Sequence, residues 1–220
     1  MNDIKKVLMV LAHPDDEIIF GWPVFQNENI EKKVLICSSD FYNQERQWCK
    51  YRKEALFEVC RKVGADVTCL DYPSGFYKVP TRRPPEHPPT EFGDSHSPVR
   101  RLYRHIVKNI LTLEKDCDAV FTHNPFGEYG HLDHKMLFDL VIKNSTKDVI
   151  ITDIVLSSNW SEKPEFTERL KRIYYSDKIE TGCSLDNSLL EFCKREYEKK
   201  NGWTWNRPIQ KECSLYRIGS

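Results

Sequence analysis

The chain has 220 residues, of which 33 are basic and 33 acidic, so its formal net charge is zero. Hydrophobic residues make up 40% and charged residues 30%, which is the balance of a folded globular protein. This balance argues against a nucleic-acid-binding surface spread over the chain, and no apolar run approaches the roughly 20 residues of a membrane span. We expect a single soluble domain over residues 1–220, with no nucleic-acid partner and no membrane span.

The cysteine pattern and the N-terminus both indicate a cytoplasmic protein. The chain has eight cysteines, none of which forms a CxxC pair, and several lie inside apolar segments such as VLICSSD. Disulfide frameworks are expected mainly in small secreted chains, so we predict reduced thiols. Acidic residues interrupt the N-terminal apolar run after a few positions, which does not fit a signal peptide.

Apolar runs alternate with helical patterns along the chain. In chain order, we predict a strand at 5–11, a short helix at 16–26, a strand at 33–39, a helix at 45–63, a strand at 66–72, a helix at 97–113, a strand at 118–123, a helix at 131–144, a strand at 148–158 and a helix at 187–201. Strands that are apolar on both faces and separated by helices predict a Rossmann-like, doubly wound α/β fold, with a mostly parallel sheet covered on both faces.

A proline-rich stretch at about 78–98 interrupts this pattern and predicts an extended loop. A loop of this length is either a functional lid or a disordered insert. It carries Arg82, Arg83 and His87, and Arg100 follows it. This basic cluster would either meet a phosphate or nucleotide on a substrate or form a solvated charged loop.

Two polar stretches follow strands that we expect to be neighbours. AHPDDE directly follows the first strand, and HNPFGEYGHLDH, residues 123–134, follows the fourth. In a doubly wound sheet of order 3-2-1-4-5, strands 1 and 4 are adjacent, and a crevice opens beyond their carboxyl ends. The first turn lacks GxGxxG, which disfavours a dinucleotide site. We therefore expect the two stretches to form one site.

The residue types in these stretches are those of a catalytic metal centre. Imidazole and carboxylate groups bind zinc, and three such ligands leave a position for water. A further carboxylate can accept a proton from that water, and a further histidine can stabilise an oxyanion. Taken singly, Asp15 or Asp16 could cap a helix, and His131 and His134 could be ordinary surface or core histidines. Their joint placement favours the metal site.

The two motifs together resemble the PIG-L (LmbE-like) family of zinc-dependent de-N-acetylases. The resemblance is strongest at AHPDDE and GEYGHLDHK, covers roughly residues 5–145 and fades in the last third. It implies a bound Zn²⁺, or another divalent metal, with His13, Asp16 and His134 as ligands. It also implies that Asp15 is the general base.

The resemblance assigns four more residues. His131 matches the histidine that supports the oxyanion or protonates the leaving amine, and Asp133 matches the acid that orients this histidine. Tyr129 matches a position that in some members lends its hydroxyl to the oxyanion. Arg52 matches an arginine that binds substrate, although the family's glutamate three residues later is here Ala55.

These assignments predict an enzyme that removes acetyl from an N-acetylglucosamine-type amino sugar or its conjugate, a small molecule. One alternative is a zinc hydrolase acting on an ester or a non-sugar amide, and another is a non-catalytic carbohydrate- or metal-binding domain. His123 and Asn124 are either supporting residues of the site or ordinary core residues. Trp203 and Trp205 either stack on a sugar ring or belong to the core. An oligomer is possible.

Overall fold

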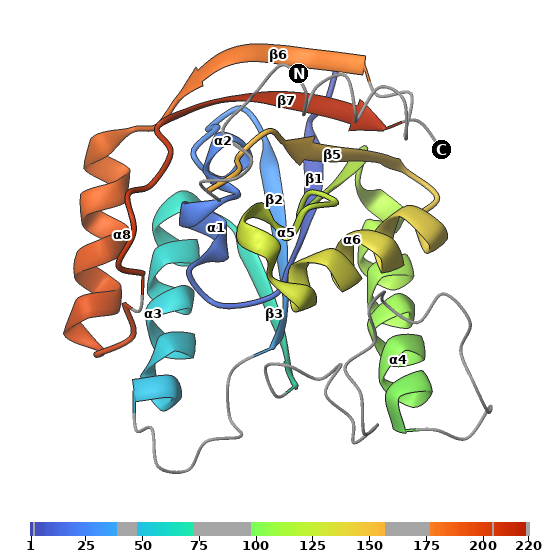
Figure 1. Cartoon of the computed structure of the whole chain (residues 1–220), viewed down its shortest axis with the longest axis horizontal. Helices are drawn as coiled ribbons and strands as arrows, with labels where there is room; N and C mark the ends of the chain where they lie inside the picture. Colours follow the sequence, from blue (N-terminus) through green and yellow to red (C-terminus); the bar gives the residue numbers. More distant parts are fainter. Residues whose placement is uncertain (2, 39–47, 73–97, 157–176, 204, 219–220) are drawn as a thin grey trace.

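The computed structural model describes residues 1, 3–38, 48–72, 98–156, 177–203 and 205–218 (Figure 1). Within these residues, seven strands form one sheet of order β3-β2-β1-β4-β5-β7-β6. The strands are β1 Lys6–Leu11, β2 Glu31–Ser38, β3 Asp66–Tyr72, β4 Ala119–Thr122, β5 Asp148–Thr152, β6 Asp177–Ser184 and β7 Glu212–Ile218. The proline-rich stretch and its cluster of Arg82, Arg83 and His87 lie outside the described residues.

The first five strands are parallel and follow the predicted order 3-2-1-4-5, which confirms the doubly wound, mostly parallel fold. Two further strands, β6 and β7, extend the sheet beyond β5 by antiparallel pairing and were not predicted from the sequence. The β6 sequence, DKIETGCS, is mostly polar because the strand lies at the sheet edge, so it lacks the apolar run that identified the others. The predicted strand at 148–158 ends earlier, at Thr152.

The helices expected at 45–63, 97–113, 131–144 and 187–201 are present where the structure describes these segments, whereas the helix expected at 16–26 is divided and the short α5 was not predicted. The helices are α1 Asp16–Ile19, α2 Trp22–Phe25, α3 Trp48–Val63, α4 Pro98–Leu113, α5 Gly127–Gly130, α6 Leu132–Asn144 and α8 Asn187–Lys199, with a short 3-10 turn at Glu114–Asp116. The helix expected at 16–26 is divided into α1 and α2 at Gly21. A Cβ atom on Gly21 would lie 2.7 Å from Cε of Met9 and 3.0 Å from the carbonyl oxygen of Glu17. A Cβ at this position would crowd the backbone of Glu17 and displace the end of the Met9 side chain, so glycine suits the junction between α1 and α2.

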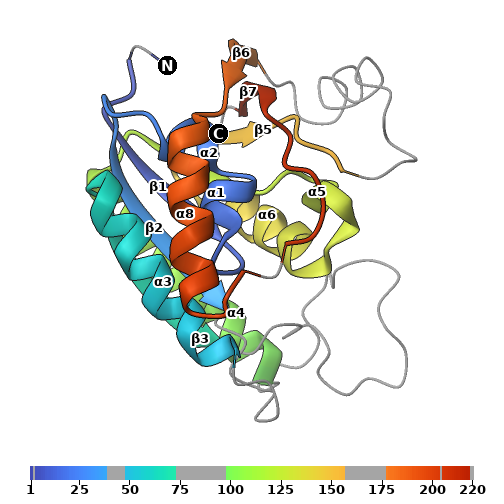
Figure 2. The ribbon, with the colours of Figure 1, turned by 90° about the vertical axis from the view of Figure 1, so that its left-hand side faces the viewer.

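Helices cover both faces of the sheet, and each face has its own core. On one face, α1, α2, α3 and α8 pack on the sheet through residues such as Ile18, Trp22, Leu56 and Tyr197. On the other face, α4 and α6 pack through a second cluster. Figure 2 shows α8 lying beside α3, and these two helices are in contact. The C-terminal third of the described chain thus contributes a helix to the first face.

The pairing of β1 with β4 positions the two polar stretches. The strands are parallel, with Val7 opposite Ala119 and Val10 opposite Thr122, so the loops that follow them leave the same edge of the sheet. The main-chain N–H of Ala12 donates to Nε2 of His123 at 3.0 Å, which joins the two loops directly.

Two of the broader expectations concern the described residues as a whole. No helix among them is both long enough and apolar enough to cross a bilayer. The side chains of seven cysteines are described, and none of these seven forms a disulfide.

Candidate metal centre

The loop after β1 holds its acidic residues in an unusual backbone conformation. Asp15 has φ 91° and ψ −16°, in the left-handed region that non-glycine residues rarely adopt. Asp15 occupies the N-cap position of α1, but its side chain makes no capping hydrogen bond. The carboxylate of Asp16 accepts from the main-chain N–H of His13 at 2.7 Å. Such strain in a loop of buried polar groups is typical of functional sites.

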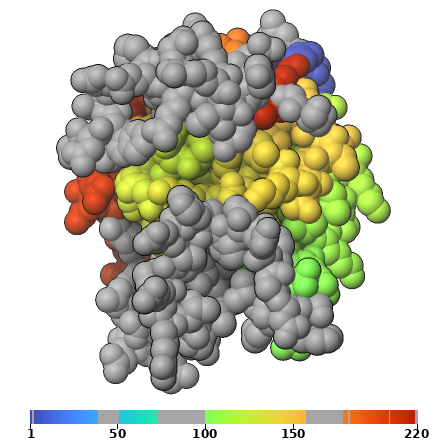
Figure 3. Space-filling model, turned by 45° about the vertical axis from the view of Figure 1, so that its right-hand side comes forward, coloured from blue at the N-terminus to red at the C-terminus, as the bar shows by residue number. Residues whose placement is uncertain are grey.

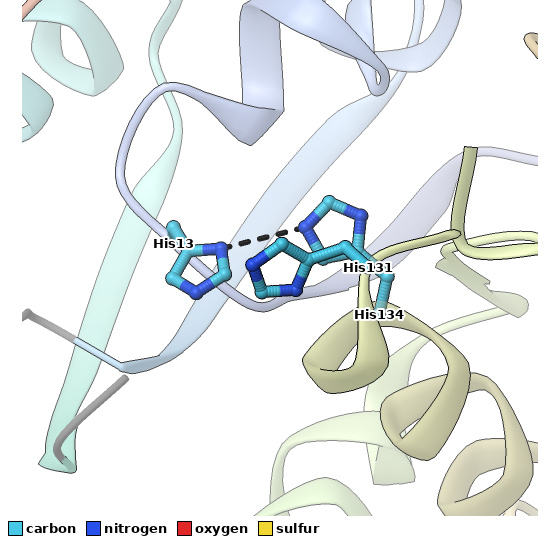
Figure 4. Close-up of side chains that lie close together, drawn as sticks. All are labelled: His13, His131 and His134. Carbon is cyan, nitrogen blue, oxygen red and sulfur yellow. Dashed lines mark hydrogen bonds between the residues drawn. The ribbon is translucent and has the colours of Figure 1, made fainter. Parts of the chain in front are cut away.

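The loop after β4 brings a second set of polar groups to the same edge. It makes the short turn α5 and then enters α6 with His131 as N-cap, whose Nδ1 accepts from the main-chain N–H of Asp133. His134 lies one turn further, fully buried. Figure 4 shows His13, from the first loop, beside His131 and His134 from the start of α6.

Three side-chain atoms form a nearly equilateral triangle that fits a metal ion. Nδ1 of His13 and Nε2 of His134 each lie 3.5 Å from Oδ2 of Asp16, and the two nitrogens lie 3.4 Å apart. Ligands at about 2.0–2.1 Å from a tetrahedral zinc lie about 3.3 Å from one another. The residues predicted as metal ligands are therefore brought together with the spacing of three zinc ligands. We call His13, Asp16 and His134 the metal triad.

The carboxylate partners of the two triad histidines lie on the ring nitrogens that face away from the triangle. Nε2 of His13 lies 3.2 Å from Oδ2 of Asp133, and Nδ1 of His134 lies 2.6 Å from Oε2 of Glu128. When each of these nitrogens donates to its carboxylate, Nδ1 of His13 and Nε2 of His134 carry the lone pairs. Carboxylate–histidine pairs of this kind orient metal ligands and raise their basicity.

Asp133 contacts both histidines at this edge of the sheet. The family resemblance assigned its carboxylate to His131, and its main-chain N–H donates to Nδ1 of His131 at 3.2 Å. Oδ2 of Asp133 also lies 3.2 Å from Nε2 of His13, 120 positions away in the chain, a contact that sequence spacing did not predict. The predicted part of Asp133 in orienting His131 stays a prediction.

His123 offers a second group of possible metal ligands, with Asp16 and His134. Its Nε2, however, accepts from the N–H of Ala12 at 3.0 Å, and its Nδ1 lies 3.2 Å from Oε2 of Glu128. The N–H of Ala12 occupies the lone pair that a metal would need. We therefore assign His123 to supporting the site, together with Asn124, whose Oδ1 accepts from the N–H of Glu128 at 3.2 Å.

Glu128 is a residue that the sequence analysis placed in the loop but gave no role. It is 1% exposed, and Oε2 accepts from both His123 and His134 while Oε1 accepts from the N–H of Asn124. Burial alone would raise the pKa of this carboxyl, but the adjacent histidines lower it to about 2. The only sequence signal was an acid six residues before His134, which does not reveal its partner.

We expect Glu128→Gln to weaken zinc binding by about 10- to 100-fold, because the neutral amide loses the negative charge that supports the histidines. Its NH₂ group would also face either both histidine N–H groups or the N–H of Asn124. Competition with a chromophoric chelator measures this affinity. Glu114→Gln is the matched control, because Glu114 is equally buried but accepts from Ser145 and Thr146. An unchanged affinity in Glu128→Gln would contradict the assigned role.

Arg52 lies inside the site and contacts the predicted base. Its side chain is 5% exposed, and Nη2 lies 2.7 Å from Oδ1 of Asp15 and donates to the carbonyl oxygen of Pro14. This guanidinium contacts the protein's own loop, and the substrate contact that the resemblance implies stays a prediction. Burial raises the pKa of Asp15 to about 6, and the charge of Arg52 limits that rise.

The pH profile should report this pair. A base acts as a carboxylate, so kcat/KM should fall as the pH drops through the Asp15 pKa of about 6. Arg52→Met removes the charge that lowers this pKa, so the acid limb should move up by about 1 unit or more. Lys53→Met is the control, since Lys53 pairs with the exposed Asp71. An acid limb unmoved in Arg52→Met would exclude Asp15 as the titrating base.

His131 and Tyr129 complete the predicted set around the metal triad. Burial and the neighbouring His134 and His13 lower the pKa of His131 to about 3. Since its Nδ1 accepts from Asp133, the neutral ring carries its proton on Nε2. The Tyr129 ring lies 5.5 Å from that of His131 and 5.6 Å from that of His134, between centroids.

The two C-terminal tryptophans lie near the site but not in the metal triad. The Trp205 ring is 5.5 Å from Tyr129 and 5.4 Å from Phe20, and Trp203 lies 6.2 Å from Tyr197. Both pack against the first core while remaining partly exposed. Stacking on a sugar ring stays a prediction.

A separate cavity of about 570 Å³ lies between α4 and α6. Figure 3 shows the green surface of α4 and the yellow surface of α6. Its lining includes Arg100, from the predicted basic cluster, with Val107, Leu111 and Leu140. None of its described lining residues belongs to the metal centre. The cavity therefore does not take part in the site.

Comparison with known proteins agrees with this geometry. A family profile described as GlcNAc-PI de-N-acetylase, PIG-L, matches residues 8–145, which include both loops of the site. The chain belongs to the PIG-L family. An uncharacterized protein of Acanthamoeba polyphaga mimivirus is 28% identical over 143 residues, covering 61% of this chain. The match covers 55% of that relative, so the chain corresponds to about half of its length.

Solved structures of other proteins confirm the fold of this PIG-L family chain. A teicoplanin deacetylase in a zinc-inhibited form has a TM-score of 0.59 at 13% identity, with 97% of each chain covered. The N,N'-diacetylchitobiose deacetylase from Pyrococcus horikoshii has a TM-score of 0.51 at 16% identity, covering 92% of this chain and 72% of the other. At these sequence identities the structural likeness supports the fold alone, and the activity is argued from the residues of the site.

Proposed function

We propose that this PIG-L family protein is a zinc-dependent hydrolase that removes the acetyl group from an N-acetylglucosamine-type amino sugar or its conjugate. The observation that carries the proposal is the metal triad, whose three ligand atoms are separated by 3.4–3.5 Å. The buried carboxyl of Asp15 lies next to it in the chain and within range of the charges of Asp16 and His13. A site that only bound metal would not need this additional carboxylate.

The residues around the metal triad divide the proposed chemistry among them. A metal bound there would polarise the amide carbonyl and acidify a water molecule. Asp15 accepts a proton from the attacking water while the water oxygen forms the bond to the carbonyl carbon. Nε2–H of His131 donates to the oxygen on which negative charge develops, and the Tyr129 hydroxyl is a second candidate donor.

The leaving amine needs a proton as the carbon–nitrogen bond breaks. The low pKa of His131 keeps its ring neutral near pH 7, which disfavours it as the acid. Asp15 is protonated by the first step, and its pKa of about 6 suits both accepting and returning a proton near neutrality. We therefore assign both transfers to Asp15, which yields acetate and a free amine.

The experiment that tests this function is an assay of zinc-loaded protein against a panel of N-acetylglucosamine conjugates. Release of acetate together with the free amino sugar is the expected result. The panel should include an acetyl ester and a non-sugar acetamide. Faster cleavage of either would replace the amino-sugar proposal, while zinc binding without turnover of any compound would favour a non-catalytic domain.

A further inference from the structure

Glu17 is a buried acid at the site to which the proposed chemistry gives no task. It ends the AHPDDE motif, lies on α1 and is 0% exposed. An acidic residue in the first turn of a helix favours the positive N-terminus, but this effect does not require burial. A carboxyl group in such surroundings is costly unless its oxygens have partners, so its contacts indicate why it is there.

Both oxygens of Glu17 have partners, and one of them is Asp15. Oε2 accepts from the main-chain N–H of Asp15 at 2.9 Å, and Oε1 accepts from the hydroxyl of Tyr197 at 2.7 Å. Tyr197 is 0% exposed and lies on α8. Glu17 therefore links the backbone of the proposed base to a helix 180 residues away.

The end of α8 also packs against Arg52. The N–H of Gly202 donates to the carbonyl oxygen of Tyr197 at 2.7 Å. A Cβ on Gly202 would lie 2.8 Å from Cγ and 3.2 Å from Cα of Arg52. The same helix end thus lies against both residues that contact Asp15.

We propose that Glu17, held by Tyr197, is a positioning residue that keeps Asp15 in its left-handed backbone conformation. At φ 91° an aspartate is disfavoured, so the surrounding contacts must hold it there. The hydrogen bond from the main-chain N–H of Asp15 to Glu17 fixes the peptide group between Pro14 and Asp15. The ion pair with Arg52 fixes the carboxylate of Asp15. The family match ends at residue 145, before Tyr197. The catalytic consequence rests on the proposed function, but the contact itself does not.

The first test measures the contact without turnover. Amide hydrogen exchange at Asp15 should be slow in the wild-type protein and about tenfold faster in Glu17→Leu, which keeps the volume but removes both acceptors. Tyr197→Phe removes a single oxygen and is the variant to use if Glu17→Leu does not fold. Tyr216→Phe, in the core of the other face, is the matched control and should not change exchange at Asp15.

The second test measures catalysis. Tyr197→Phe and Glu17→Leu should lower kcat, by up to about 100-fold for Glu17→Leu, with KM and zinc affinity retained. Glu17→Gln should recover most of the loss, because its amide can accept from Asp15 and donate to the oxygen of Tyr197. In an Asp15→Asn background, Tyr197→Phe should have no further effect on kcat, since its effect acts through the carboxylate.

The results separate this inference from the proposed function. An unchanged rate of amide exchange at Asp15 in both Tyr197→Phe and Glu17→Leu overturns the positioning role. The role is also overturned if Tyr197→Phe lowers kcat equally in the wild-type and the Asp15→Asn backgrounds. A wild-type protein that releases no acetate from any conjugate contradicts the proposed function instead. In that case the exchange measurement still decides whether Glu17 and Tyr197 hold Asp15.

Discussion

Asp15→Ala is expected to retain zinc and to lower kcat by about 10²- to 10⁴-fold, the usual contribution of a general base. The metal triad does not include this residue, so metal content should not change. The reaction loses both its proton acceptor and the proton donor for the leaving amine. Rates of acetate release, measured on variants with equal zinc content, give the effect.

A second substitution at the same position separates chemistry from backbone conformation. Alanine is disfavoured at the φ of 91° found at Asp15, whereas asparagine tolerates this region better than most residues. Asp15→Asn should therefore lose turnover to a similar extent while preserving the loop. Asp139→Asn, at a half-buried carboxyl on α6 that pairs with Lys143, is the control. Wild-type rates in Asp15→Ala would show that another group is the base.

His134→Ala is expected to lower zinc affinity by more than about 100-fold and to abolish turnover at stoichiometric zinc, because it removes one of three ligands. The substitution also leaves Glu128 without its shortest contact, at 2.6 Å. Zinc titration followed by acetate release measures both effects. His105→Ala, at an exposed histidine on α4, should alter neither. One tightly bound equivalent of zinc in His134→Ala would contradict the assignment of the metal triad.

The architecture of the first five strands was predictable because each central strand is a short apolar run between helices. Val7–Leu11 and Val34–Cys37 are buried on both faces, and this continuous burial produces the pattern. The edge strand β6 is mostly polar and lacks that signal, so it escaped prediction, whereas the other edge strand, β3, keeps enough apolar residues to be recognised. The division between α1 and α2 also escaped prediction, because sequence spacing does not show how closely Gly21 approaches the backbone of Glu17 and the side chain of Met9.

The location of the site was predictable from a topological rule. Parallel neighbouring strands deliver their following loops to one edge, so AHPDDE and HLDH had to meet once β1 and β4 were adjacent. The sequence also named the residues of the metal triad through the family motif. What it lacked was any measure of the separation between His13 and His134, 121 positions apart.

The partners of the buried charges were not predictable. Asp133 contacts His13, Arg52 contacts Asp15, and Glu128 contacts two histidines. These pairings depend on how loops from three elements fold over one another, which sequence spacing does not encode. Burial makes each pairing necessary, since an unpartnered charge at this depth is costly. The sequence therefore supplies the groups, and the fold selects their partners.

Metal reconstitution tests the central claim most directly. The protein is freed of metal with a chelator, and acetate release from an N-acetylglucosamine conjugate is followed as zinc is added. We predict no turnover without metal, recovery that is complete at one equivalent, and no recovery in Asp15→Ala despite equal zinc binding. Full activity in the chelated protein, or none in the zinc-loaded protein with any conjugate, would contradict a catalytic metal centre built on His13, Asp16 and His134.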